Sequence, residues 1–215
     1  ILGLAAVLEL WGIKIGPIIA GLGLFGVAVA LGAQDLFKNL ISGIMILLEK
    51  RFQLGDVISV PGHTKGTVEH IGFRSTLIRK FDTTPITLPN YIFAEAPILN
   101  YTNKNYRRIN WSVGLEYNST LDQIKNFTKS ISTYIEENDN FIVNRNYKSF
   151  VRLDKFNDSS IDILILCFTS TNDWDKYLET KEELAHFIKQ QVEHLGLSFA
   201  FPSRSIYIEK NDDKV

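Results

Sequence analysis

One glycine pattern in the sequence is of the kind that binds nucleotides. Gly21, Gly23 and Gly26 match the G-x-G-x-x-G spacing, in which glycines let a backbone approach a pyrophosphate at the start of a helix. That chemistry needs a preceding parallel strand, whereas Pro17 stands where the strand should run, and the run Ile15 to Gln34 has no formal charge. The surroundings exclude a dinucleotide site, so these glycines need another explanation.

Other residues that could support catalysis or metal binding are scattered. His63 and His70 flank a predicted turn, and His186 and His194 are eight apart, but neither pair has the carboxylate or cysteine neighbours of a zinc site. The single cysteine, Cys167, lies in an apolar run and is interpreted as a small core residue of a reducing compartment. We therefore expect no catalytic residues, no metal, no cofactor and no enzyme activity.

Charge divides the chain into two unlike parts. Of the 47 charged residues (23 Lys and Arg plus 24 Asp and Glu), only 6 fall in positions 1–50. The 20 uncharged residues from Ile15 to Gln34 would span about 30 Å as a helix, the thickness of a bilayer core. A net charge of −1 argues against nucleic-acid binding through phosphate contacts. The pattern predicts a membrane segment followed by a water-soluble body.

The flanks of the uncharged run predict its orientation. Leu2 to Trp11 is typical of the end of an apolar helix, and Gly12 to Pro17 supplies a tight turn, so a hairpin at a membrane surface is expected. Lys14 at this end is outnumbered by basic residues beyond the other end, namely Lys38, Lys50 and Arg51. The positive-inside rule then places the soluble body in the cytoplasm of a multi-pass protein of the inner (cytoplasmic) membrane.

Periodicity predicts three modules, at residues 1–51, 52–106 and 107–215. Helical spacing continues past Gln34 to Leu48, which predicts one long helix with an amphipathic second half. From Phe52 the period is two, and an all-β module is expected, with strands Asp56 to Val60, Gly66 to Ile71, Ser75 to Phe81 and Pro85 to Leu88.

The third module shows strands and helices in the order βαββαβ, which is the ferredoxin-like α+β signature. Thr120 and Asp173 are predicted N-caps and Gly196 a C-cap. The expected elements are strand Arg108 to Val113, helix Leu121 to Glu137, strands Phe150 to Phe156 and Ile161 to Phe168, helix Asp173 to Leu195, and strand Ser205 to Ile208.

Small residues give the first helix two flanks on which other helices could pack closely: Ala20, Gly23, Gly26, Ala28 and Ala30. A helix with two such flanks can contact two identical neighbours and close a ring. Val27 and Leu31, one turn apart between the flanks, would then form stacked apolar rings that gate a pore by dewetting. The alternative is that both side chains face lipid or another helix.

The segment Leu31 to Gly43 resembles the pore helix and its bend in the small-conductance mechanosensitive channel (MscS) family. Gly196 with Phe199, Phe201 and Pro202 is similar to that family's closing segment. The resemblance continues in order through the β module, at Gly55-Asp56, Gly66-Thr67-Val68, Pro89-Asn90 and Ile98-Leu99-Asn100. The pair Gln34-Asp35 is more similar to the longer, low-conductance members of the family.

The resemblance implies a fold and a function. The fold is a membrane α-helical pore segment followed by an all-β Sm-like domain and an α+β ferredoxin-like domain, assembled as a homo-heptamer with a hollow cytoplasmic cage. The implied function is a channel that membrane tension opens, so that ions and small solutes leave on hypo-osmotic shock. Its partners would be its own copies, lipids and the permeating solutes, and no nucleic acid.

Four residues are expected at the helix bend and the cytoplasmic mouth of the pore: Gln34, Asp35, Lys38 and Gly43. Asp35 and Lys38 follow Leu31 by four and seven residues and could form rings of opposite charge at the mouth. The alternative is that Asp35 caps the second half of a bent helix.

Two rival functions remain open, a membrane-anchored Sm-like RNA-binding protein and a ligand-sensing protein. RNA binding would require exposed aromatic residues beside clustered basic residues. In the β module, Arg74, Arg79 and Lys80 have only Phe73 and Phe81 as aromatic neighbours in the sequence. A ligand sensor would need a pocket of convergent polar groups, for which no pattern is present.

Overall fold

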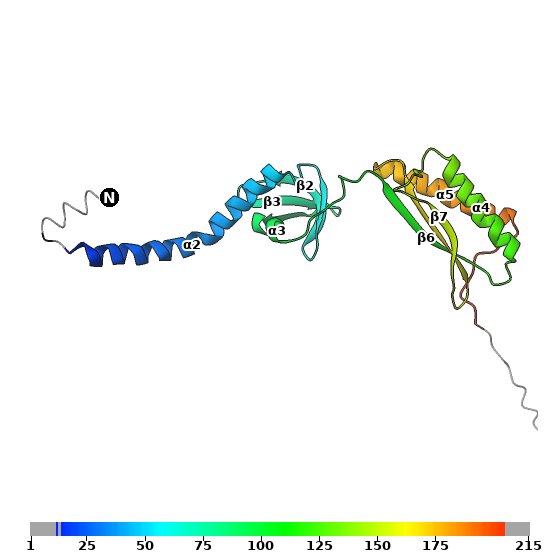
Figure 1. The fold of residues 1–215 in the computed structure, drawn as a ribbon, viewed down its shortest axis with the longest axis horizontal. Coiled ribbons are helices and arrows are strands. Elements are labelled where there is room, and N and C mark those ends of the chain that lie inside the picture. The colour runs from blue at the N-terminus through cyan, green and yellow to red at the C-terminus, as the bar shows by residue number, and fades with distance from the viewer. Residues whose placement is uncertain (1–11, 13, 205–215) are drawn as a thin grey trace, which may run out of the picture. The chain divides into compact units, whose positions relative to one another are not determined.

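A computed structural model of the chain describes Gly12 and residues 14–204. These residues divide into two compact units, one ending at Asn103 and the other beginning at Lys104 (Figure 1). The predicted helix end at Leu2 to Trp11 and the predicted strand Ser205 to Ile208 lie outside the described residues.

A single long helix, α2 (Ile15–Glu49), is the first described element of the first unit and confirms the predicted continuous helix. Its 35 residues extend for about 50 Å, and the ribbon bends along its length (Figure 1). The helix ends at Lys50, which adopts a left-handed conformation (φ 51°) and donates its N–H to the Ile46 carbonyl at 3.1 Å. Among the described residues, only α2 is long and apolar enough to cross a membrane.

An antiparallel sheet in the order β4-β3-β2-β1-β5 forms the rest of the first unit. The four predicted strands are present, and the sequence pattern missed the short helix α3 and the two-residue β5. Phe52 and Phe93 lie at the centre of the core with ring centroids 5.2 Å apart, and Ile46 of α2 packs with them. The elements are β1 (Val57–Val60), β2 (Thr64–Ile71), β3 (Ser75–Lys80), β4 (Pro85–Pro89), α3 (Asn90–Glu95) and β5 (Leu99–Asn100).

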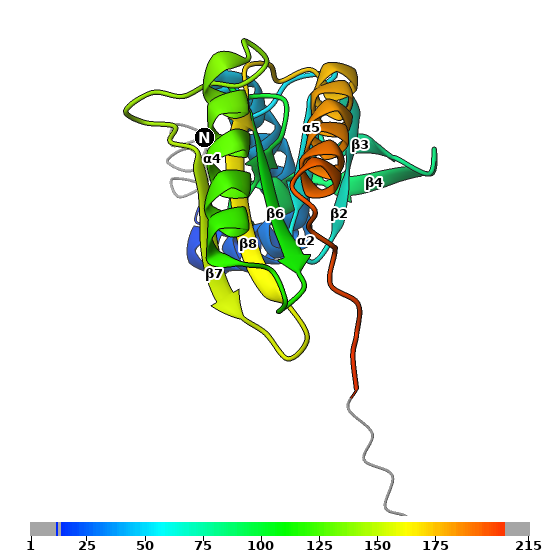
Figure 2. The ribbon, with the colours of Figure 1, turned by 90° about the vertical axis from the view of Figure 1, so that its right-hand side faces the viewer.

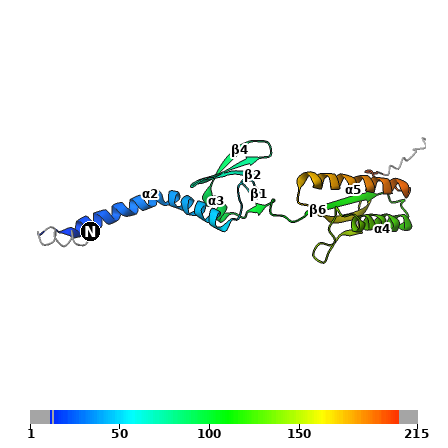
Figure 3. The ribbon, with the colours of Figure 1, turned by 90° about the horizontal axis from the view of Figure 1, so that it is seen from above.

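The second unit has a three-stranded antiparallel sheet, in the order β6-β8-β7, with α4 and α5 lying along the strands (Figures 2 and 3). Alternate residues of β8, Ile163, Ile165 and Cys167, are buried with the apolar faces of both helices. The first five elements of the predicted βαββαβ order are present, and the sixth lies outside the described residues. The elements are β6 (Arg107–Leu115), α4 (Leu121–Glu137), β7 (Phe150–Phe156), β8 (Ile161–Thr169) and α5 (Trp174–His194).

Helix caps in the second unit follow the predicted residues. Thr120 and Gln123 form a reciprocal capping box at the start of α4. The Asp173 carboxylate accepts the Lys176 N–H at 2.9 Å at the start of α5. Gly196, with φ +63°, directly follows the C-cap Leu195. These local signals confirm the predicted helix ends.

Candidate functional site

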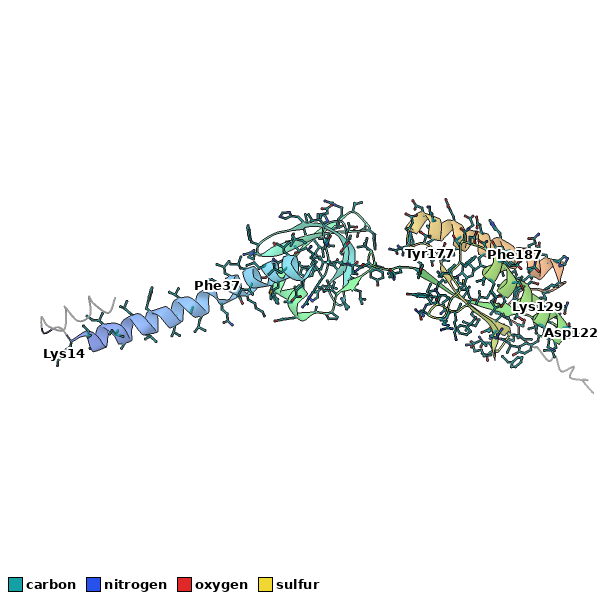
Figure 4. All side chains as sticks on the ribbon, turned by 45° about the horizontal axis from the view of Figure 1, so that its top comes forward. Lys14, Phe37, Asp122, Lys129, Tyr177 and Phe187 are labelled. Atoms are coloured by element: carbon teal, nitrogen blue, oxygen red, sulfur yellow. The ribbon has the colours of Figure 1, made fainter. Side chains whose placement is uncertain are left out.

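The first half of α2 carries the predicted pore residues, and nothing else in the described chain covers them. Val27 and Leu31 are 56% and 67% exposed. A Cβ atom built on Gly23 or Gly26 would meet no atom within 4 Å. Figure 4 shows the side chains between Lys14 and Phe37 projecting from α2 with no other described element beside them. Any packing on this segment must come from outside these residues.

Helical geometry groups the predicted residues by face. At about 100° per residue, Val27 and Leu31 project within about 40° of each other. Gly23 and Ala30 lie on one side of this pair and Ala28 on the other, whereas Gly26 is turned further from the pair. Ala20 falls on the face of Val27 itself. The helix thus has small residues on both sides of one apolar edge.

The second half of α2 packs against the five-stranded sheet and α3 of the first unit, which together are called the β unit below. The face of α2 that makes this contact is not the one expected. Its buried residues are Asn39, Ser42, Gly43 and Ile46, so polar and small side chains make most of the contact. Apolar residues on the opposite side of the helix remain exposed, among them Phe37, Ile41, Ile44 and Leu48. Periodicity predicted an amphipathic segment, and the structure shows that its polar side faces the protein.

Gly43 is the point of closest approach between α2 and the β unit. A Cβ at this position would lie 2.6 Å from the Asn90 side-chain nitrogen and 2.8 Å from the Phe73 carbonyl oxygen. One turn earlier, the Asn39 side-chain oxygen accepts the Tyr91 N–H at 3.2 Å, and its amide nitrogen donates to the Asp35 carbonyl at 2.9 Å. Only a residue without a side chain fits this contact.

Asn90 holds the surface on which the helix docks. Its side chain is fully buried, and its amide nitrogen donates to the Gly72 and Phe73 carbonyls at 2.8 and 3.1 Å. The amide oxygen accepts the Thr76 hydroxyl at 2.9 Å. These bonds fasten the β2–β3 turn to the start of α3. The pair Pro89-Asn90 after a strand is the sequence signal for this role, which the sequence analysis did not assign.

Lys38 contacts both turns of α3. Its ammonium nitrogen lies 2.6 Å from a Glu95 carboxylate oxygen and 4.6 Å from the centre of the Tyr91 ring. Sequence patterns singled out Lys38 but gave no sign of Glu95, which is 57 positions later.

Asp35 does not cap a helix. Because α2 continues without a break through Asp35, no second helix N-terminus exists for Asp35 to cap, and that alternative is wrong.

A cavity of about 580 Å³ opens beside this docking contact, between α2 and the β3 and β4 strands. Its lining brings together the predicted mouth residues Asp35 and Lys38 but not Gln34 or Gly43. The full lining is Asp35, Leu36, Lys38, Asn39, Arg74, Ser75, Thr87, Pro89 and Tyr91.

No catalytic or metal-binding arrangement is formed by residues that the structure describes. Within residues 14–204, no three His, Cys, Asp or Glu side chains are grouped as metal ligands. Cys167 is fully buried, as predicted for a core residue, and this burial raises the pKa of its thiol to about 12. A thiol in that state is not a nucleophile at neutral pH.

Two family models match the chain in sequence order. The model described as the mechanosensitive ion channel β-domain matches residues 35–103, and the one described as the C-terminal region of the mechanosensitive ion channel MscS matches residues 109–199. The chain belongs to the MscS family of mechanosensitive ion channels. This confirms the family that the sequence resembled.

Individual MscS-family proteins agree with this assignment. An uncharacterized member from Aquifex aeolicus is 41% identical over 96% of this chain and 55% of its own length. The small-conductance mechanosensitive channel MscMJ of Methanocaldococcus jannaschii is 36% identical over 99% of this chain and 59% of its own length. The chain thus spans little more than half of these relatives.

Solved structures share the fold. The crystal structure of Helicobacter pylori MscS in a closed state aligns with a TM-score of 0.75 at 27% identity, over 95% of this chain and 78% of that one. Arabidopsis thaliana MSL1 aligns with a TM-score of 0.77 at 23% identity, over 94% and 72% of the two chains, a likeness of fold alone. An MscS-like fold with an apolar N-terminal helix is confirmed. The finer division into Sm-like and ferredoxin-like domains stays a prediction.

The MscS family consists of ion channels and not of enzymes, in agreement with the predicted lack of catalysis. Neither family match supports the rival RNA-binding or ligand-sensing functions.

Proposed function

We propose that the chain is the pore-forming and cytoplasmic part of a channel that membrane tension opens, releasing ions and small solutes on hypo-osmotic shock. The observation that carries the proposal is the continuity of α2. One helix passes from an apolar half that the described chain leaves uncovered into a half docked on the β unit. A force that moves the first half is therefore transmitted to the second.

Lipid and neighbouring copies are the proposed partners of the uncovered half. Large apolar side chains such as Leu22, Leu24 and Phe25 are 66 to 74% exposed, which is unfavourable in water. The small residues beside Val27 and Leu31 would let the α2 helices of a ring approach closely. We propose a homo-heptamer, in line with the family resemblance, with these two residues forming the narrowest rings.

Gating would then be a shift of population between a narrow and a wide ring. Tension favours the wide ring because that state occupies more area in the bilayer. Widening would hydrate the Val27 and Leu31 rings, which in the narrow state exclude water. The contact of Asn39 and Gly43 with the β unit would anchor the lower half of each helix while the upper half moves.

The proposed location is the inner (cytoplasmic) membrane, in a multi-pass protein, with the sheet of the first unit and the whole second unit in the cytoplasm. The excess of basic residues after α2, at Lys50 and Arg51, over the single Lys14 before it supports this orientation. The proposed modules are residues 1–51 for the membrane segment, 52–106 for the β domain and 107–215 for the α+β domain.

The proposal is tested by recording from excised patches of liposomes that contain the purified protein. Steps of suction should evoke step-like currents whose open probability rises with tension. Expression should also rescue a bacterial strain that lacks its own mechanosensitive channels from hypo-osmotic shock. Incorporated, oligomeric protein that gives no current up to the rupture of the patch would contradict the proposal.

A further inference from the structure

Two adjacent residues of α2 hold the same short helix by different physical means. Lys38 reaches α3 through an ion pair with Glu95 at 2.6 Å and a position 4.6 Å from the centre of the Tyr91 ring. Asn39 reaches it through a neutral hydrogen bond from the Tyr91 N–H at 3.2 Å. Glu95 and Tyr91 are four residues apart on α3, so they present one face to Lys38.

The two contacts differ in their exposure to solvent ions. The side chains of Lys38 and Glu95 are 44% and 59% exposed, whereas Asn39 is only 8% exposed. The range of electrostatic attraction falls from about 10 Å at 0.1 M salt to about 3 Å at 1 M. Salt therefore weakens the Lys38–Glu95 pair directly, whereas it affects the neutral Asn39 bond only through the loss of that pair.

Other charges near Lys38 do not replace Glu95. Asp35 lines the same cavity as Lys38, but no ion pair within 4.0 Å joins the two in the part of the chain that the structure describes, and Arg74, which also lines this cavity, carries the same charge as Lys38. Glu95 is thus the principal partner of Lys38, and it lies on the β unit and not on α2.

We propose that the Lys38–Glu95 pair is a salt-sensitive clamp, which makes the attachment of the pore helix to the β unit depend on cytoplasmic ionic strength. The inference rests on the proposed tension-gated channel. When the clamp is weakened, the equilibrium between the narrow and the wide state of the ring shifts away from the state in which the Lys38–Glu95 pair is formed. An exposed pair changes such an equilibrium by about a factor of two per subunit, and the factors multiply when the copies move together.

The test is the tension at half-maximal opening in inside-out patches. The cytoplasmic solution is changed from about 0.1 M to about 1 M KCl, with sucrose in the dilute solution to match osmolality. We expect the wild-type midpoint to shift with salt. Lys38→Gln and Glu95→Gln should both lie near the wild-type high-salt midpoint and should no longer respond. The double reversal Lys38→Glu with Glu95→Lys should restore the response.

A matched control comes from the second unit. Lys189 and Glu193, both on α5 of the second unit, form another exposed ion pair, with side chains 61% and 65% exposed. Lys189→Gln should keep the full wild-type response to salt. A salt response in Lys38→Gln equal to that of the wild type would overturn the clamp while leaving tension gating intact.

Hydrogen exchange in the detergent-solubilised protein provides a readout that does not require current. The Tyr91 amide, which donates to Asn39, should exchange faster at high salt in the wild type. The same amide should show equal exchange at both salt concentrations in Lys38→Gln. Salt-independent exchange in the wild type would overturn the clamp, whatever the patches show, whereas absent currents alone would count against the proposed function.

Discussion

The core of the second unit and the helix α2 are built from similar apolar residues, yet they are covered in different ways. Phe127, Ile131 and Ile135 of α4 are fully buried by the sheet and α5 of the same unit. Leu22, Leu24 and Phe25 of α2 are mostly exposed. The second unit therefore closes its core with its own elements, whereas no other element of the described chain covers these residues of α2.

The same contrast exists within α2. Where this helix contacts its own chain, the contact uses Asn39, Ser42, Gly43 and only one large apolar residue, Ile46. Hydrogen bonds and close backbone approach give such a contact a defined geometry without a large buried apolar area. Moving a helix held in this way costs less free energy than moving one embedded in an apolar core, which agrees with the movement proposed for α2.

The largest effect is expected in the buried core of the second unit. Phe127→Ala should lower the free energy of unfolding of the second unit by about 3 to 5 kcal/mol, because it leaves a cavity that the packed helices cannot fill. Denaturant titration with tryptophan fluorescence would measure the loss, since Trp111 and Trp174 lie in this unit. Leu24→Ala on α2 is the control and should leave that transition unchanged. If Phe127→Ala and Leu24→Ala lowered this free energy of unfolding equally, the contrast between the second unit and α2 would be wrong.

The next effect concerns the contacts between copies. Gly26→Val should push neighbouring helices apart, at about 1 to 3 kcal/mol per site, and each copy in a ring adds its share. Within one chain a Cβ at this position meets no atom within 4 Å, so the fold of the sheet in the first unit and of the second unit should be unchanged. Native mass spectrometry of the solubilised protein would report the subunit number. An intact ring with wild-type gating would show that Gly26 faces lipid.

A smaller effect is expected where α2 meets its own chain. Gly43→Ala places a Cβ against Asn90 and the Phe73 carbonyl, so the helix must shift outward at a cost of about 1 to 3 kcal/mol. The Tyr91 amide, which bonds to Asn39, should then exchange faster with solvent. Gly32→Ala, which meets no atom within 4 Å, is the matched control. Unchanged exchange in Gly43→Ala would mean that the contact is looser than the structure shows.

Sequence reasoning was most accurate where local signals agree. The bounds of α4 and β7 are those predicted, because a capping residue, a clear period and a change of period mark them. Helix α3 and strand β5 have six and two residues, too few to show a period. Both were missed, although Pro89-Asn90 marks the start of α3.

The docking contact was beyond sequence reasoning for a different reason. Periodicity shows which side of a helix is apolar but not which side meets the protein. That outcome depends on the surface that Asn90 organises from residues 14 and 18 positions away. The partnership of Lys38 with Glu95 likewise arises only from the fold. Val27 and Leu31 as the constriction, and the small residues as the ring contact, stay predictions.

The most direct test of the account is the resting and tension-evoked current of Leu31→Ser beside that of Val29→Ser. Val29 is exposed on the same helix but projects about 160° away from Leu31, so it serves as the matched control. A hydroxyl at the constriction should hydrate it, giving current without suction and a lower tension at half-maximal opening in Leu31→Ser alone. Wild-type leak and midpoint in Leu31→Ser, or equal changes in both variants, would contradict a gate at this position.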